Sequence, residues 1–241
     1  MDDAAIMPFL TSANIACGMH AGDPETMDKT VALALAHGIR IGAHPGYADR
    51  QNFGRTPMTL SPRAVEDLVL YQVAALDGFV RSQRGKLSHV KPHGALYNQA
   101  ADDLTLARAI ARGIARFDPS LVLVGLGGSR LIEAARDAGL PVAEEAFADR
   151  RYLPNGKLSP RSRPGSLLEN PAEAAAQAAL IAQHGAVIAA DGSKISVRAD
   201  TICLHGDTPG ARSIASEIRK RLESEGVVIA PLGRGESRPR L

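Results

Sequence analysis

The chain lacks tryptophan, has only two cysteines and few aromatic residues (4%), and contains no long run of hydrophobic residues. A membrane-spanning helix needs about 20 apolar residues in a row, and a secretory signal needs a basic start followed by an apolar segment. Residues 1–10 fit neither pattern, so we expect a cytoplasmic protein without a membrane anchor. Cys17 and Cys203 each lie in an apolar run, and we expect both to pack as small hydrophobic side chains rather than to form a disulfide.

A strong charge of one sign is also missing. The chain has 28 Lys and Arg against 26 Asp and Glu, which gives a net charge of +2. Such a small net charge argues against the basic surface by which proteins bind nucleic acid. Basic residues do gather near the C-terminus, and we expect residues 233–241 to form a flexible tail.

Short β-branched runs alternate with helical patterns along the whole chain. The runs predict strands at 11–17, 39–44, 87–93, 121–127, 141–147, 186–190, 201–206 and 227–230, and the patterns between them predict helices at 24–38, 61–80, 103–117, 129–139, 171–185 and 209–226. Strands that alternate with helices form a mainly parallel sheet. With 241 residues, the chain is long enough for one large domain. We therefore predict a single α/β domain over residues 1–241, and the number of units favours a TIM-like (β/α) barrel over a small open sheet.

Histidines mark the ends of the predicted strands. In parallel α/β folds, ligands bind where the strands end at their carboxyl termini, and four of the seven histidines lie at such ends: His20, His44, His93 and His205. His37 and His184 lie near helix C-termini, where a structural role is expected. His89 comes four residues before His93 and points to the same face of the strand, so it fits either the core or the site. We predict that the four strand-end histidines cluster.

Two strand ends repeat one arrangement, in HAGDPETM and HGDTPGAR. Asp23 in the first, and Asp207 or Thr208 in the second, occupies an N-cap position followed by proline. A helix N-terminus also attracts anions, so these residues fit either helix capping alone or anion binding. The glycine turn GLGGS at 125–129 is a third, weak candidate, because it matches neither the P-loop nor the dinucleotide-binding pattern.

Two polar loops are rich in basic residues. The loop at 48–58 carries Arg50, Asn52 and Arg55, and the loop at 148–165 carries Asp149, a tyrosine and five basic residues. Each loop is either a solvated face of the protein or a mobile lid whose arginines hold a carboxylate or phosphate.

Six blocks of sequence resemble the LamB/YcsF family: SANIACGMHAGDP, IGAHPGYADRQNFGR, HVKPHGALYN, EEAFADRRY, PRS and ADTICLHGDTPGA, in that order. The resemblance runs over nearly the whole chain. It implies a distorted (β/α) barrel of the glycoside hydrolase/deacetylase type, and ATP-dependent opening of 5-oxoproline to L-glutamate together with two partner subunits, B and C. Family members usually begin with a strand similar to DLNADLGE, which is not found here before Asp2. The first barrel strand is therefore expected to be missing from this sequence, either because the true start lies upstream, which we favour, or because the protein works without it. A barrel without this strand would have an exposed edge, which would favour a homo-oligomer.

The implied reaction suggests roles for the polar residues. A lactam carbonyl is a poor electrophile, and phosphorylation of its oxygen by ATP with Mg²⁺ would activate it, so the protein must supply positive charge, a base and stabilisation of the oxyanion. We expect catalytic roles for His20, His44, Lys91, His93, Asp149 and His205, and substrate or phosphate binding by Asn14, Asp23, Arg55, Tyr97, Asn98, Glu145, Arg150 and Asp207. In this scheme Lys91, Arg55 and Arg150 supply charge, or Lys91 is an ion-pair partner. Asp149 or Glu145 would orient a histidine, and Asn14 would bind the substrate carboxylate or lactam.

Two other functions remain open. His20, His44 and His93 are candidate metal ligands, and with a carboxylate they would suit a metal-dependent deacetylase or amidohydrolase in which Zn²⁺ activates water. A non-catalytic subunit that presents a carbohydrate or lactam to its partners is the third interpretation.

Overall fold

The computed structural model describes residues 3–232, which form parts of two compact units. We call the unit of residues 11–143 and 231–232 the four-strand unit, and the unit of residues 3–10 and 144–230 the hairpin unit. The single domain expected from the sequence stays a prediction, and the tail expected at 233–241 lies outside the described residues.

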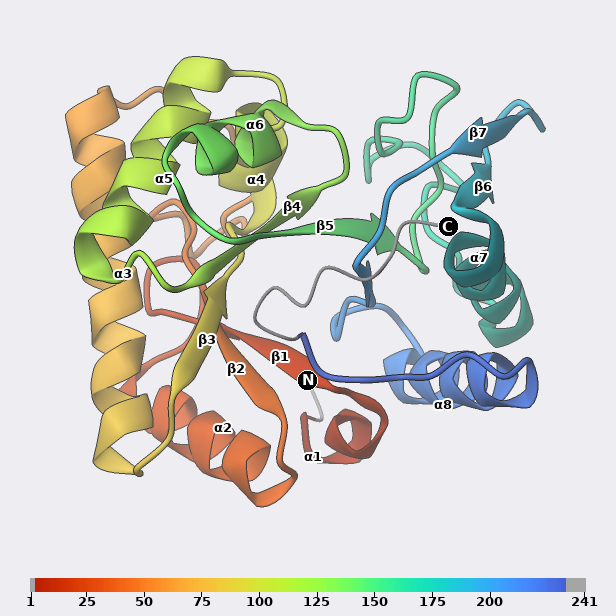
Figure 1. Ribbon diagram of the computed structural model, residues 1–241, viewed down its shortest axis with the longest axis horizontal. Helices are drawn as coiled ribbons and strands as arrows, with labels where there is room; N and C mark the ends of the chain where they lie inside the picture. Colours follow the sequence, from red (N-terminus) through yellow and green to blue (C-terminus); the bar gives the residue numbers. More distant parts are fainter. Residues whose placement is uncertain (1–2, 233–241) are drawn as a thin grey trace. The chain divides into compact units, whose positions relative to one another are not determined.

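The four-strand unit is built from parallel strands that are neighbours in chain order (Figure 1). Its strands are β1 (Ser12–Ala16), β2 (Arg40–His44), β3 (Leu87–Val90) and β4 (Val122–Leu126). Its helices are α2 (Pro24–Ala36), α3 (Pro62–Ser82), α4 (Gly94–Ala100), α5 (Leu104–Phe117) and α6 (Arg130–Asp137). Parallel neighbours need a crossover connection, and the helices supply it. All strands of the unit therefore end at the same edge of the sheet.

Helix α3 shows how the sequence selects these elements. Ser61 caps the helix by accepting a hydrogen bond from Ala64 N, and five aliphatic side chains at helical spacing are fully buried, namely Val65, Val69, Val73, Leu76 and Val80. The helix packs on α5. The buried carboxylate of Glu66, on α3, accepts hydrogen bonds from Arg112 (3.1 Å) and Arg116 (2.7 Å) of α5. These hydrogen bonds lower the pKa of Glu66.

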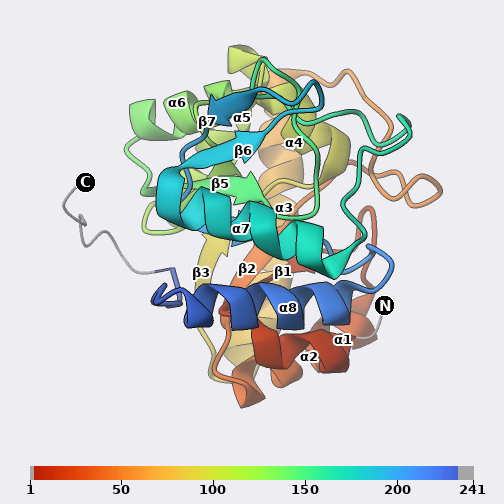
Figure 2. The same ribbon diagram turned by 90° about the vertical axis from the view of Figure 1, so that its right-hand side faces the viewer.

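The hairpin unit takes its name from the antiparallel pair β6 (Ala186–Ile188) and β7 (Lys194–Ser196). Strand β5 (Val142–Phe147) begins in the four-strand unit, and its residues 145–147 pair in parallel with β8 (Thr201–Cys203). Helices α7 (Pro171–His184) and α8 (Ala211–Ser224) pack against one another (Figure 2). Helix α1 (Asp3–Ile6) and the 3-10 helix η1 (Met7–Phe9) pack on α8.

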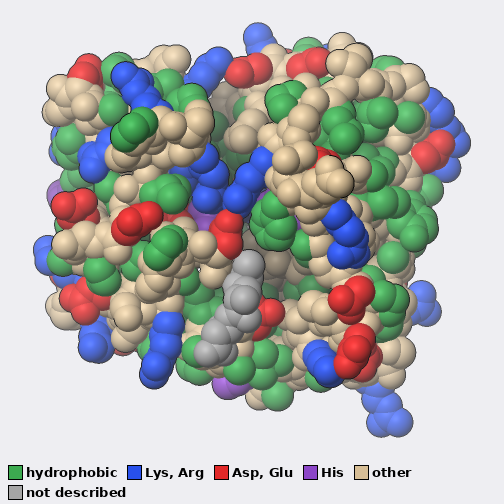
Figure 3. All heavy atoms as spheres, turned by 180° about the vertical axis from the view of Figure 1, so that it is seen from behind, with side chains coloured by type: hydrophobic (Ala, Val, Ile, Leu, Met, Phe, Trp, Pro, Cys, Tyr) green, Lys and Arg blue, Asp and Glu red, His purple; other side chains and the backbone are tan. Residues whose placement is uncertain are grey.

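The strand order β1-β2-β3-β4-β5-β8 makes a six-stranded parallel sheet with helices between its strands. This architecture confirms the prediction of an α/β fold of the distorted TIM-like barrel type. Within residues 3–232, no helix has both the length and the apolar character that crossing a membrane requires. On the face drawn in Figure 3, basic and acidic side chains are interspersed, as the small net charge suggests.

The structure corrects several predicted elements. Residues 227–230 form no strand: Gly226 ends the preceding helix in a left-handed conformation, and Val228 is 76% exposed. An apolar run forms a strand only where a neighbouring strand accepts its hydrogen bonds, and composition does not reveal such a neighbour. Strand β7 and helices α1, η1 and α4 were not predicted, and the predicted strand at 186–190 is half of an antiparallel hairpin.

Candidate active site

Three strand-end histidines of the four-strand unit lie together. His20, His44 and His93 follow or end β1, β2 and β3. The rings of His20 and His93 are stacked, with centroids 3.9 Å apart and planes 4° from parallel. The ring of His44 lies edge-on to both, at centroid distances of 5.9 and 4.8 Å. The structure thus brings together three of the four histidines for which clustering is predicted, and the fourth, His205, belongs to the hairpin unit.

Backbone carbonyls fix the ring tautomers in this cluster. His44 Nδ1 lies 2.6 Å from Lys91 O, and His93 Nε2 lies 2.7 Å from Phe53 O. A carbonyl oxygen can only accept, so each of these ring nitrogens carries a hydrogen. The two remaining nitrogens, His93 Nδ1 and His44 Nε2, are 3.0 Å apart. They form a hydrogen bond when one ring takes up a second proton, and they face each other as lone pairs when both rings are neutral.

The surroundings of the cluster favour neutral rings. Burial lowers the pKa of His20 to about 3, with smaller contributions from positive charge at His93, Arg50 and Arg55. Burial, His93 and Lys91 likewise lower the pKa of His44 well below its ordinary value. The rings of His20 and His44 are therefore neutral at pH 7. A bound anion would offset the repulsion from the nearby cations, whereas burial, the larger cause, favours neutral rings.

The loop at 49–56 closes around the stacked rings. The Asp49 carboxylate organises it by accepting hydrogen bonds from Asn52 and from Thr56 N. Phe53 has a left-handed backbone (φ 55°), and its ring meets those of His20 and His93 edge-on at 5.5 and 5.1 Å. Glycine is required next to it, because a Cβ on Gly54 would lie 2.8 Å from the Cβ of His20. Phe53 was missed by the sequence analysis, since its main contribution is a backbone carbonyl.

Several candidate binding residues of the four-strand unit already have structural contacts. Arg50 donates to the carbonyls of Gly18 and Gly22, which ties the loop at 49–56 to the loop at 17–23. The guanidinium of Arg55 lies 4.9 Å from the centroid of the Phe53 ring. Asp23 caps α2 by accepting from Thr26 N (2.8 Å), as the capping interpretation predicts, and its role in substrate binding stays a prediction.

Lys91 and Tyr97 are both buried, and the Lys91 ammonium lies 5.8 Å from the Tyr97 ring centroid, within cation–π range. Asn98, the next residue on α4, is exposed.

His89 is a core histidine whose ring contacts the side chain of Asn14. The ring is fully buried, with its nitrogens 2.7 Å from Ser88 Oγ and 3.0 Å from Asn14 Oδ1. Burial, together with the charge of Lys91, lowers the pKa of His89 to about 4. A Cβ on Gly42 would overlap this ring, so glycine is needed on the neighbouring strand. Of the two interpretations of His89, the structure supports the core, and it shows Asn14 partly engaged there.

The hairpin unit contains an Asp–His pair. The carboxylate of Asp149 is fully buried and lies 3.0 and 3.1 Å from His205 Nδ1. It also accepts from His205 N (3.0 Å) and from Thr208 Oγ1 (2.7 Å). Burial alone would raise the pKa of Asp149, but the hydrogen bonds from His205 and Thr208 outweigh burial and lower it. Phe147 stacks on the His205 ring, with centroids 5.5 Å apart.

This arrangement can perform acid–base chemistry. An ionised carboxylate that accepts from Nδ1–H holds the imidazole in one tautomer, leaves Nε2 as the basic nitrogen, and stabilises the imidazolium that forms when Nε2 takes a proton. Asp149 is a carboxylate that orients His205, and a role for Glu145 stays a prediction. Thr208 is a further member of the group. The sequence suggested Asp207 or Thr208 as a helix cap or anion-binding residue, but α8 begins at Ala211 with Gly210 at the N-cap position.

The remaining candidates of the hairpin unit lie in or beside this loop region. Arg150 is buried and donates to Ser159 O (2.6 Å), and burial lowers its pKa to about 10. Asp207 lies 4.0 Å from Arg161, and Glu145 is buried on β5. The loop at 148–165 is thus built around internal contacts, although its role as a lid stays untested.

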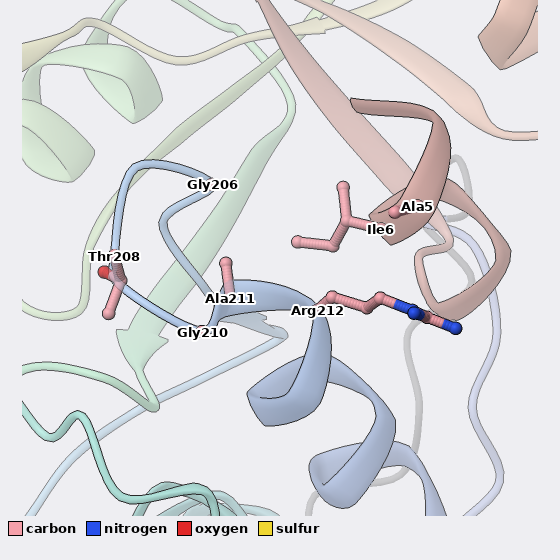
Figure 4. A pocket seen from close by; sticks show the side chains of 7 residues that line it. All are labelled: Ala5, Ile6, Gly206, Thr208, Gly210, Ala211 and Arg212. Atoms are coloured by element: carbon pink, nitrogen blue, oxygen red, sulfur yellow. The ribbon is translucent and has the colours of Figure 1, made fainter. Parts of the chain in front are cut away.

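A cavity of about 280 Å³ lies at the N-terminus of α8 (Figure 4). Its lining consists of Ala5, Ile6, Gly206, Thr208, Gly210, Ala211 and Arg212. Through Thr208, whose hydroxyl donates to Asp149, the cavity adjoins the Asp–His pair. Between residues 3 and 232, no three His, Cys, Asp or Glu side chains are arranged to hold a metal ion. For His20, His44 and His93, the role of metal ligand stays a prediction.

Comparison with known proteins gives consistent matches over nearly the whole chain. The family model described as LamB/YcsF family matches residues 1–237. A protein of Methylococcus capsulatus, named as the A subunit of 5-oxoprolinase, is 53% identical over 96% of this chain and 89% of its own length. A protein of the same name from Pyrococcus furiosus is 49% identical over 96% of this chain and 91% of its own. The crystal structure of a lactam utilization protein from Thermus thermophilus superposes with a TM-score of 0.90, at 48% identity, over 95% of this chain and 92% of that one.

Proposed function

The chain belongs to the LamB/YcsF family, and from this membership we propose that it is the A subunit of a 5-oxoprolinase. In this proposal it opens the lactam ring of 5-oxoproline to L-glutamate in an ATP-dependent reaction, together with partner subunits B and C in the cytoplasm. The observation that carries the proposal is the near-full-length identity of about half to proteins of that name from bacteria and archaea.

The Asp149–His205 pair supports the hydrolytic part of the proposal. Ring opening adds water to the lactam carbon, so a base must take a proton from that water while the C–N bond breaks and the nitrogen gains a proton. His205, oriented by the buried carboxylate of Asp149 and by Thr208 behind it, is suited to take this proton and later to return it. We assign it the role of general base.

The histidine cluster supports the second part of the proposal, which is the binding of negatively charged groups. 5-Oxoproline carries a carboxylate, and ATP with Mg²⁺ carries phosphates. The four-strand unit offers the cations Lys91 and Arg55 near the neutral rings of His20 and His44. We assign binding of these anionic groups to this cluster. ATP would supply the phosphoryl group that activates the lactam oxygen and would leave as ADP, and a second water would release the phosphate as glutamate forms. The residues of the chain would bind and orient these groups.

The test is release of glutamate from 5-oxoproline by the chain co-purified with its B and C subunits, with and without ATP. We expect glutamate only with ATP, and its loss in the Asp149→Asn variant. Glutamate release without ATP would instead indicate a simple amidohydrolase. Tight binding of 5-oxoproline without any turnover by the complex would indicate a ligand-presenting subunit.

A further inference from the structure

Two buried glutamines hold the loops that carry the candidate catalytic residues. The first, Gln177, lies on α7 and directs its amide nitrogen at three backbone carbonyls. Its Nε2 lies 2.7 Å from Phe147 O, 3.2 Å from Ala148 O and 2.8 Å from Arg150 O. The three carbonyls flank Asp149, the residue whose carboxylate orients His205.

The geometry of this contact explains why the chain bends there. After β5 the backbone turns so that several carbonyls point toward α7, and buried carbonyls need hydrogen-bond donors. A primary amide supplies two hydrogens from one atom. Leu168 N donates to Asp149 O at 2.9 Å, and Ala148 N donates to Cys203 O at 2.9 Å. Gln177 thereby completes a set of hydrogen bonds that fixes the backbone on both sides of Asp149.

The second glutamine, Gln72 on α3, holds a strand-end loop in the four-strand unit in the same way. Its side-chain amide pairs with both backbone groups of Gly46, accepting from Gly46 N (3.0 Å) and donating to Gly46 O (2.9 Å). Gly46 lies against the stacked histidines, since a Cβ there would be 2.7 Å from His20 Nδ1 and 3.3 Å from the Cβ of His93. Gln72 is fully buried.

We propose that Gln177 and Gln72 are positioning residues, which fix the backbone of the strand-end loops so that Asp149, and the stacked pair of His20 and His93, keep their working geometry. Neither glutamine contacts the side chains that it positions in the hydrogen bonds described. A displacement of about 1 Å at a catalytic group can lower a rate by as much as about 100-fold, so the backbone clamp controls the rate without touching the substrate. The catalytic part of this proposal rests on the proposed function, whereas the structural part does not.

The experiment uses two substitutions of nearly equal volume, Gln177→Met and Gln177→Glu, in the full chain. Both keep the packing, but methionine removes the two donor hydrogens and a glutamate carboxylate would face three carbonyl oxygens. The matched control is Ile181→Val, a buried change on the same helix that leaves the loop bonds intact. The first readout is the NMR signal of the His205 Nδ1–H proton that is hydrogen-bonded to Asp149.

We expect both Gln177 variants to weaken or shift this signal, and the control to retain it at equal folded fraction. In the complex with subunits B and C, we expect kcat to fall about 10- to 100-fold in the Gln177 variants with KM little changed. In a parallel pair with Val80→Ala as the control, Gln72→Met should mainly raise KM, because the proposed function assigns anion binding to the cluster that contains His20 and His93.

An unchanged His205 signal in folded Gln177→Met would overturn the proposal, as would equal kcat for that variant and its control. The NMR measurement needs neither ATP nor partner subunits. It therefore decides the positioning role even if the wild-type complex releases no glutamate, an outcome that would refute the proposed function alone.

Discussion

Acid should destabilise this protein through its buried neutral histidines, before its carboxylates are protonated. The pKa of His89 falls from 6.5 to about 4 on folding, and that of His20 to about 3. Because the unfolded chain binds a proton at each site below pH 6.5 while the folded chain does not, the free energy of unfolding falls as the pH falls from 6.5 toward these lower values. Below the folded pKa, each histidine contributes no further change.

The magnitude follows from the shifts. Each histidine costs up to about 1.4 kcal/mol per pH unit in this window. Because the unfolded histidine is only half protonated at pH 6.5, His89 and His20 together remove about 3 kcal/mol between pH 6.5 and pH 5. His44 shifts in the same direction and adds to the effect. Since typical domains have about 5–15 kcal/mol of stability in total, the loss should be large enough to measure easily.

The assay is urea unfolding followed by circular dichroism at several pH values between about 7.5 and 4.5, which span the titration of the histidines. The His89→Gln variant removes one titrating group, so its stability should fall less steeply with acid, by about 1.4 kcal/mol per pH unit. The surface variant His37→Gln serves as the control and should keep the wild-type slope. Identical slopes for His89→Gln and the wild type would refute the reasoning.

Three further predictions concern single contacts. Asp149→Asn should lower kcat of the assembled complex by about 1,000-fold or more, because an amide no longer selects the tautomer, and glutamate release measures it. Gly42→Ala should destabilise the chain by about 3 kcal/mol or more, since the new methyl group overlaps the His89 ring; thermal unfolding measures the shift. Glu66→Gln should lower the urea midpoint of unfolding, because it leaves Arg112 and Arg116 facing a neutral amide between α3 and α5.

Each has a control. For Asp149→Asn, an unchanged circular dichroism spectrum separates a lost tautomer from a lost fold, and full activity would contradict the assigned base. Gly78→Ala is the partner for Gly42→Ala, because its Cβ would meet no atom within 4 Å, and equal effects would contradict the overlap. Asp191→Asn, at an exposed site, should shift the urea midpoint far less than Glu66→Gln.

The positions of the histidines were predictable because a parallel sheet places all strand ends at one edge. That rule needs only the strand pattern, and it correctly brings His20, His44 and His93 together. The same strand pattern gave a wrong prediction at 227–230, where four apolar residues have the composition of a strand but do not pair with a neighbouring strand. Local sequence encodes the preference for extended backbone, whereas pairing depends on what lies beside it.

The glutamines show a different limit of sequence reasoning. Gln72 interrupts the apolar stripe of α3 between Val69 and Val73, and Gln177 lies among the buried alanines of α7. A polar residue in an apolar stripe signals a buried hydrogen bond, so their importance was detectable. Their partners are backbone atoms of distant loops, however, and backbone groups carry no identity in a sequence.

The left-handed backbone at Phe53 has a consequence for how variation at this site would appear. The atom that fixes the tautomer of His93 is the carbonyl oxygen of residue 53, and every amino acid has that atom. In a saturation mutagenesis experiment, position 53 should accept asparagine or glycine, which adopt this conformation readily, more easily than valine or isoleucine. Tolerance there would follow backbone preference rather than side-chain chemistry. The substitution pattern at position 53 would therefore resemble that of an ordinary turn residue, although its carbonyl oxygen fixes the proton of His93.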